Sequence, residues 1–273
     1  MSQHSSSLVP PVIAFMTDFG QRDGYVGVMK GVVLSITPHA QLVDITHEIE
    51  PQKVAAGAWI LATSYRYFPR GTTFVCVVDP GVGSVRYPIA MYAGEWFFVG
   101  PDNGLFSYVF TEQPLHEVVI LSKPAYRLEQ MSTTFHGRDI FAPGAAHIAR
   151  GLPLAALGPG IDPLQLQRLD LKFPMRQGER IDGYIVYIDY YGNLITNIPL
   201  SMVPALFSSP EVQLTVCGSV ITERRRFFAE GEEGSPFIYS DSSGYVSVAV
   251  HSGNAARTLH VGSGEPVRLV VKS

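Results

Sequence analysis

Short, mostly apolar segments alternate with helix-length segments through the first 150 residues, and this alternation constrains the fold more than any other feature. Apolar runs of four to six residues at 12–16, 42–45 and 73–78 are separated by segments 24–36 and 52–67, where apolar residues recur at helical spacing. Strands that are apolar on both faces are typical of a parallel sheet covered by helices. The first part of the chain is therefore predicted to be an α/β domain with a mostly parallel sheet and helices on both faces.

Two more apolar runs, 88–92 and 96–100, are separated by three residues and predict a hairpin attached to this sheet. A further helix is predicted at about 139–150, with Asp139 as its N-cap.

The pattern changes after Gly151. Residues 151–180 are rich in Pro, Gly and Leu and are typical of a linker. Short alternating runs then follow at 181–190, 212–221, 236–240, 244–250 and 266–271, which predict a smaller all-β, barrel-like domain. We therefore expect a disordered tail at 1–11, an α/β domain at 12–170 and a barrel-like domain at 171–273.

Composition excludes several classes of protein. The formal net charge is −4 and no basic stripe occurs, which argues against a partner nucleic acid. No apolar run reaches the roughly 18–20 residues that cross a bilayer, and the polar, Ser-rich start does not resemble a signal peptide. We expect a cytoplasmic protein without a membrane partner. The two cysteines, Cys76 and Cys217, form neither a disulfide framework nor a metal-ligand pattern, and both are expected to be buried.

Several acids fall at the carboxyl ends of the predicted strands, where open α/β sheets bind ligands: Asp18, Asp44, Asp79 and Asp102. Such residues also serve as helix caps and turn formers. Asp18 opens a strand-to-helix turn, where a carboxylate can accept hydrogen bonds from a ribose diol. Because neither GxGxxG nor GxxxxGK[ST] occurs, a bound nucleoside is not expected to be held through a triphosphate.

Three loops carry further polar residues with two interpretations each. Residues 79–86 combine Asp79, two glycines and Arg86, either as a Gly-rich loop with a solvated Arg or as an Asp and an Arg that face one centre. His136 begins a predicted helix, as a surface residue or as a group that orients a water or takes its proton. Asn193 follows a strand in 189–197, as part of a β-turn or as a reader of a base edge. His47 and nearby acids do not have the spacing of a zinc motif, so no metal is expected.

Taken in order, these motifs resemble the S-adenosyl-L-methionine (SAM) hydroxide adenosyltransferase family, formerly DUF62, whose relatives include fluorinase and chlorinase. The resemblance covers about residues 12–271 and rests on eight motifs, at residues 17–20, 25–31, 43–47, 78–83, 100–104, 135–139, 191–197 and 242–245.

The resemblance implies a homotrimer, with each site formed by the N-terminal domain of one subunit and the C-terminal domain of its neighbour. It implies nucleophilic attack at C5′ of SAM and release of L-methionine, with no cofactor. Hydroxide as the nucleophile gives adenosine, and halide gives a halo-deoxyadenosine.

The resemblance also distinguishes the hydrolase branch of the family from the halide-using branch. The hydrolase branch has an Asp–Arg–His trio, which maps to Asp79, Arg86 and His136. Fluorinase has Tyr at the position of Asp79, a Tyr-Ser pair at the positions of His136 and Gly137, and a long insertion that is absent after Arg86. We therefore expect hydrolysis, with a halide-using adenosyltransferase and a non-catalytic adenosine- or SAM-binding protein as the alternatives.

The chemistry agrees with this assignment. The sulfonium leaves as a neutral thioether and needs no general acid, whereas bulk water, with a pKa near 15.7, is a weak nucleophile. Arg86 would stabilise hydroxide, His136 would hydrogen-bond the water or take its proton, and Asp79 would orient both.

The resemblance implies binding roles for seven residues. They comprise the ribose acceptor Asp18, the methionine-ammonium acids Asp23 and Asp189, the carboxylate contact Ser242, the adenine reader Asn193 and the aromatic walls Tyr191 and Phe227. Three positions depart from the relatives. Ser243 stands where fluorinase has an Arg, Gln52 replaces a stacking Trp, and His251 replaces a frequent Asn.

Overall fold

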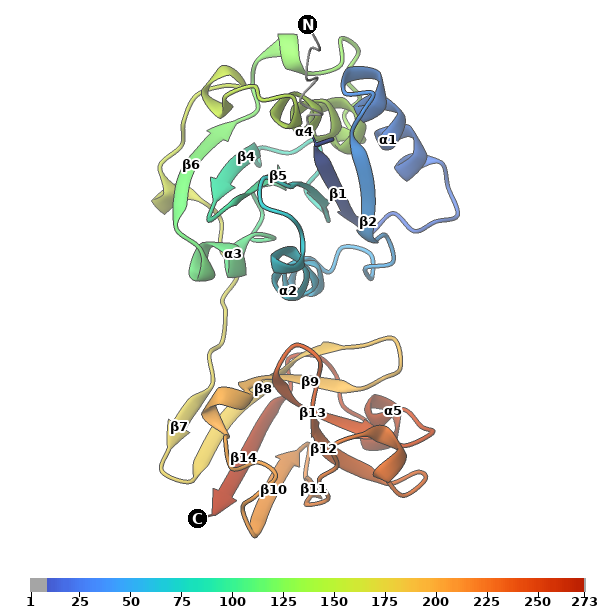
Figure 1. Cartoon of the computed structure of the whole chain (residues 1–273), viewed down its shortest axis with the longest axis vertical. Coiled ribbons are helices and arrows are strands. Elements are labelled where there is room, and N and C mark those ends of the chain that lie inside the picture. Colours follow the sequence, from blue (N-terminus) through green and yellow to red (C-terminus); the bar gives the residue numbers. More distant parts are fainter. Residues whose placement is uncertain (1–8, 273) are drawn as a thin grey trace, which may run out of the picture. The chain divides into compact units, whose positions relative to one another are not determined.

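The computed structural model describes residues 9–272 and divides into two compact units between Leu169 and Asp170 (Figure 1). Residues 1–8 of the expected N-terminal tail lie outside the described residues. The two units have the predicted fold classes, an α/β unit followed by a smaller all-β unit.

The first unit is built on a six-stranded sheet with the order β2-β1-β3-β5-β4-β6. Its strands are β1 (Val12–Thr17), β2 (Gln41–Thr46), β3 (Thr73–Val77), β4 (Pro88–Ala93), β5 (Trp96–Pro101) and β6 (Leu115–Ile120). β2, β1, β3 and β5 are parallel, and β4 joins β5 and β6 as an antiparallel neighbour. The carboxyl ends of the four parallel strands therefore meet at one edge.

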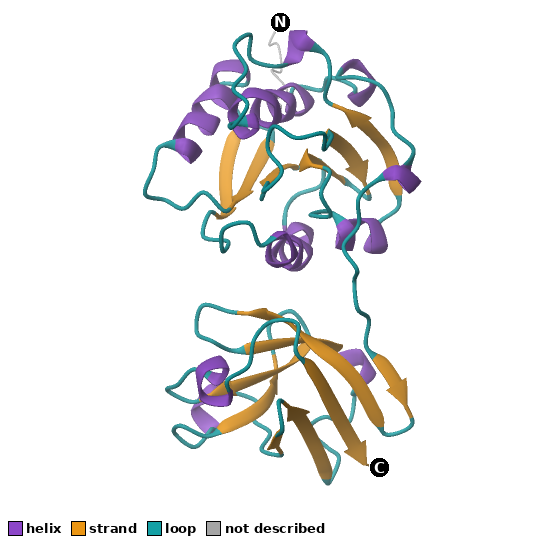
Figure 2. Ribbon diagram, turned by 180° about the vertical axis from the view of Figure 1, so that it is seen from behind, coloured by secondary structure: helices purple, strands orange, loops and turns teal. Residues whose placement is uncertain are grey.

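Helices cover both faces of this sheet (Figure 2). They are α1 (Tyr25–Ile36), α2 (Val54–Ser64), α3 (Ser107–Glu112) and α4 (Ala142–Ala149). Alternate residues of β1 face opposite cores. Ala14 and Met16 pack in the core that contains α2 and α3, and Ile13 and Phe15 pack in the core that contains α1 and α4.

Three details of this unit differ from the sequence-based expectations. Asp44 lies inside β2 and not beyond its end. Asp139 is not an N-cap, because a π-helical turn (Gly137–Phe141) precedes α4 and the buried Asp139 carboxylate accepts from the Ser132 N–H and pairs with Arg138. The stretch up to Leu169 is not a free linker: Ile161 and Leu166 are buried in the core beneath α2 and α3.

The second unit is an antiparallel, nearly closed barrel-like sheet with the order β11-β10-β14-β8-β9-β13-β12 and with β7 paired to β8. Its strands are β7 (Met175–Gln177), β8 (Arg180–Ile188), β9 (Leu194–Pro199), β10 (Glu211–Val216), β11 (Ser219–Ile221), β12 (Pro236–Ser240), β13 (Tyr245–Val250) and β14 (Pro266–Lys272). The segment after β11 hydrogen-bonds to β12 through Glu223 and Arg225, which brings the two ends of the sheet together. One short helix, α5 (Ala255–Leu259), covers part of its core.

The two cysteines behave differently. Cys76 is buried in β3 as expected, and burial raises the pKa of its thiol. Cys217 is exposed, contrary to expectation, because it occupies the turn between β10 and β11 with a left-handed φ of 47°. Across residues 9–272, none of the helices has the length and apolarity needed to span a bilayer.

Candidate active site

Asp79, Arg86 and His136 meet at the carboxyl edge of the first unit's sheet. Asp79 follows β3, and its carboxylate receives a two-point contact from Arg86: Nε donates to Oδ1 at 3.0 Å, and Nη2 donates to Oδ2. The same Nη2 lies 2.9 Å from His136 Nδ1. Both members of the ion pair are nearly buried, with side-chain exposures of 9% for Arg86 and 5% for Asp79. The trio predicted from the sequence is therefore assembled within one unit.

The Gly-rich loop makes this approach sterically feasible. Gly83 has a φ of 76°, and a Cβ there would overlap the carbonyl oxygen of Thr133. Only glycine avoids both the left-handed strain and this contact. Because Thr133 lies three residues before His136, the contact packs the loop that carries Arg86 against the segment that carries His136.

Arg86 determines which nitrogen of His136 carries the proton. A guanidinium only donates, so His136 Nδ1 accepts and the neutral ring carries its proton on Nε2. Burial and the neighbouring Arg86 charge lower the pKa of His136, and Asp79 offsets this only partly. His136 is therefore a neutral ring whose Nε2–H is a hydrogen-bond donor.

Asp18 lies close to this trio through an aromatic cluster. Phe19, the residue after Asp18, packs edge-on against Phe135, the residue before His136, with ring centroids 5.9 Å apart. Tyr25 contacts both rings. The contact between Phe19 and Phe135 brings the Asp18 turn next to the His136 turn.

Two other predicted residues of this unit adjoin the Asp18 turn. Asp18 Oδ2 accepts from the backbone N–H of Gln52 at 2.8 Å, so Gln52, with a φ of 68°, contributes its backbone here. Asp23 is exposed in the loop between β1 and α1. The fourth strand-end acid, Asp102, is buried, which raises its pKa, and it accepts from the Gln167 N–H.

The candidates of the second unit gather around Tyr239, a buried β12 residue that sequence reasoning missed. The charges of Asp189 and Asp241 act on Tyr239, and with burial they raise the pKa of its hydroxyl. The ring of Phe228 lies 5.1 Å from that of Tyr239. The loops that carry Asp189, Phe227 and Ser242 therefore flank one tyrosine. Tyr239 lies in a short strand whose central residues are all apolar or aromatic and buried, so nothing in the sequence singled it out.

The Asp189 carboxylate is largely engaged by its own turn. It accepts from the N–H groups of Tyr191 and Asn193 and from the Asn193 side chain at 2.7 Å. This is the β-turn interpretation of the loop, and it leaves the Oδ1 atom and the second Nδ2–H of the buried Asn193 to face a base edge. Tyr191, Phe227 and Ser242 are exposed.

The two remaining positions that differ from the relatives, His251 and Ser243, make local contacts. His251 Nδ1 lies 2.8 Å from the Gly231 carbonyl oxygen, so its N–H holds the segment that follows Phe227. The backbone N–H of Ser243 donates to Asp241. Within residues 9–272, no group of three or more His, Cys, Asp or Glu side chains is arranged to hold a metal ion.

Residues 13–158 match the profile of the SAM hydroxide adenosyltransferase N-terminal domain, and residues 183–268 match that of the C-terminal domain. This chain belongs to the SAM hydroxide adenosyltransferase family. The two matched ranges fall within the two units of the structure.

A named relative supports this membership over nearly the whole chain, and a solved structure has a similar fold over the same extent. An (R)-S-adenosyl-L-methionine hydrolase from Thermus thermophilus is 37% identical, over 94% of this chain and 99% of its own. A conserved Thermotoga maritima protein of uncharacterized function has a similar crystal structure, with a TM-score of 0.88 and 34% identity over 94% of this chain and 99% of its own.

A fluorinase from Nocardia brasiliensis is more distant, at 29% identity over 96% of this chain and 97% of its own. That alignment spans 291 positions, more than the 273 residues of this chain, so the fluorinase carries residues that have no counterpart here.

Proposed function

We propose that this chain is a SAM hydrolase, which converts SAM and water to adenosine and L-methionine. The observation that carries the proposal is the assembled Asp79–Arg86–His136 trio. It is supported by relatives named (R)-S-adenosyl-L-methionine hydrolase, which are 32 to 38% identical to this chain. Because those names specify the (R) form, we propose the same configuration for the substrate.

The reaction is a displacement at C5′. Water loses a proton to solvent, hydroxide forms the new C5′–O bond, and the C5′–S pair of electrons leaves with sulfur as neutral methionine thioether. Three N–H groups of Arg86 are committed to Asp79 and His136, which leaves its two Nη1 protons for the hydroxide oxygen. The Arg86 cation lowers the free energy needed to form hydroxide. Its effect is strong in a site that is shielded from solvent, because charges attract one another more strongly there than in bulk water.

His136 acts in this scheme as a donor and not as a base. Its Nδ1 lone pair already accepts from Arg86, and its Nε2 carries the proton. The Nε2–H therefore orients the attacking oxygen along the line of displacement, where positioning contributes much of the rate.

The substrate is held by residues of both units in this proposal. Asp18 accepts the ribose diol, Asp23 and Asp189 take the methionine ammonium, and Ser242 contacts its carboxylate. Asn193 reads adenine, with Tyr191 and Phe227 as aromatic walls. We further propose a cytoplasmic homotrimer in which one subunit's first unit and a neighbour's second unit share a site. No nucleic-acid or membrane partner is needed.

The decisive experiment is incubation of the protein with the separated (R) and (S) sulfonium forms of SAM, followed by chromatography. We expect adenosine and L-methionine in equal amounts from the (R) form. Arg86→Lys should lower kcat at least about 100-fold, because a lysine cannot reproduce the fork that contacts Asp79 and His136. Arg70→Lys is the matched control, because Arg70 is exposed and pairs with Glu95 on the surface.

Folded protein that forms no adenosine above the blank would refute the hydrolase. A halo-deoxyadenosine product on addition of chloride or fluoride would instead identify the halide-using alternative. Tight adenosine binding without SAM consumption would identify the non-catalytic one.

A further inference from the structure

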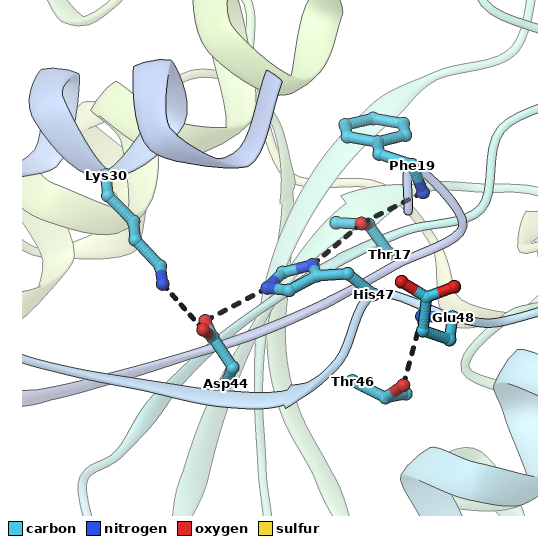
Figure 3. Close-up of polar contacts among 7 residues, drawn as sticks. All are labelled: Thr17, Phe19, Lys30, Asp44, Thr46, His47 and Glu48. Carbon is cyan, nitrogen blue, oxygen red and sulfur yellow. Dashed lines mark hydrogen bonds and ion pairs between the residues drawn. The ribbon is translucent and has the colours of Figure 1, made fainter. Parts of the chain in front are cut away.

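A chain of polar side chains, separate from the trio, runs from the partly exposed Lys30 and Asp44 to the buried His47 and Thr17 at the Asp18 turn (Figure 3). Lys30 Nζ of α1 donates to Asp44 Oδ2 at 2.6 Å. Asp44 Oδ1 lies 3.0 Å from His47 Nε2, and His47 Nδ1 lies 2.9 Å from Thr17 Oγ1. The His47 side chain is fully buried, and so is Thr17. Burial of a polar ring costs free energy unless its nitrogen atoms have polar partners.

The charges fix the direction of these contacts. Burial favours the neutral form of Asp44, yet its contacts with Lys30 and His47 lower its pKa overall, so it is a carboxylate. A carboxylate facing Nε2 requires a proton on that nitrogen. In the neutral ring, Nδ1 is then an acceptor, and the Thr17 hydroxyl donates to it. The contact between His47 Nε2 and Asp44 does not have the geometry of a hydrogen bond. The ring and the carboxylate therefore attract each other as a polar group and a nearby charge.

His47 holds the Asp18 turn at both of its ends. Thr17 Oγ1, the partner of the ring, accepts from the backbone N–H of Phe19 at 3.2 Å. The carbonyl oxygen of His47 accepts from the Gly20 N–H at 2.7 Å. Asp18 lies between these two attachments, and its Oδ2 accepts from Gln52 on a third side.

From this arrangement we propose that His47 is a positioning residue that, through Thr17, fixes the Asp18 carboxylate in the geometry that discriminates a ribose from a deoxyribose. This inference rests on the proposed role of Asp18 as the ribose acceptor. His47 itself need not touch the ligand: it restrains the turn that does.

The test compares the dissociation constants of adenosine and 2′-deoxyadenosine by calorimetry, in the wild type and in Thr17 variants. The wild type should prefer adenosine at least about tenfold, the value of a hydrogen bond to a charged group. Thr17→Val keeps the buried volume but removes the hydroxyl, and it should reduce this preference to about threefold or less. Thr17→Ser keeps the hydroxyl and should retain the preference of the wild type.

A direct variant, His47→Gln, should behave like Thr17→Val, and His116→Gln serves as its control because His116 is exposed and contacts Gly94 and Tyr92. If His47→Gln does not fold, the Thr17 pair still decides the question. A purely structural role would change stability and leave the ratio of the two dissociation constants unchanged, and that result would overturn the proposal.

Loss of the preference in Thr17→Ser, or a wild type without any preference, would also overturn it. The readout needs no turnover. Selective adenosine binding that responds to Thr17 supports the positioning role even if SAM is not hydrolysed, so failure of the hydrolase proposal is recognised separately.

Discussion

At the scale of single residues, the protonation of His136 is the property on which the proposed mechanism depends most. Burial and the Arg86 charge hold its pKa below the ordinary value of about 6.5. We expect an NMR titration of its ring, assigned by the loss of its signal in His136→Gln, to have a midpoint below 6.5. A midpoint at or above 6.5 would contradict the donor role.

A double variant, Asp79→Asn with Arg86→Met, tests the cause of this shift without leaving one buried charge unpaired. Arg86 lowers the pKa of His136 more than Asp79 raises it, so removal of both should raise it. The lowered pKa of His136 also makes the stability of the fold depend on pH. Because the folded-state pKa is below the unfolded-state value, the unfolded chain binds more protons between the two values, and the free energy of unfolding falls there as the pH falls.

The trio could be identified from the sequence as a set, but the proton on His136 could not. Asp79, Arg86 and His136 occur in motifs that resemble the family, and their contacts confirm that the fold brings them together. The Nε2 tautomer follows only from the position of the Arg86 nitrogen. Similarly, the Asp189 loop reads as a turn or as a binding loop, and only the structure shows three hydrogen bonds within it.

At the scale of elements, the Gly-rich loop depends on Gly83 for its position. We expect Gly83→Ala to destabilise the fold and lower kcat together, because the new methyl group would overlap the Thr133 carbonyl and push Arg86 away from His136. Gly71→Ala is the matched control. Gly71 has nearly the same φ, 79°, but has open space around it, so it should show only the left-handed strain of about 1–2 kcal/mol.

Thermal unfolding and kcat, measured on both variants, separate strain from crowding. If Gly83→Ala loses no more stability than Gly71→Ala and keeps its kcat, the contact with Thr133 does not position the loop.

Long, strongly patterned elements were predictable, and short or locally ambiguous ones were not. The apolar runs that became β1 and β3 and the periodic segments that became α1 and α2 lie where the pattern placed them. α3 and β6 had no distinct periodicity within a single six-residue stretch, and β9 was concealed by its turn-forming neighbours. Asp139 read as an N-cap because the sequence does not reveal the π-helical turn that extends the helix before it.

At the scale of the whole molecule, the catalytic candidates and the adenine candidates lie in different units of the chain. Arg86 belongs to the first unit, and Phe227, exposed in the second, is proposed as an aromatic wall. If sites form between subunits, each takes its two halves from two different chains. A ring of heterologous contacts, as in a trimer, permits this arrangement.

Mixed trimers therefore test the site architecture. Arg86→Lys impairs the first half of a site and Phe227→Ala the second, and the two variants would be co-expressed in equal amounts with different tags. If the halves come from different chains, about one third of the sites in trimers that contain both variants combine two intact halves. We expect the purified mixed trimers to recover about that share of wild-type activity at a SAM concentration below KM, with sedimentation velocity confirming the trimer. Sites built from a single chain would contain one defect each, and the mixture would then be no more active than the average of its two variants.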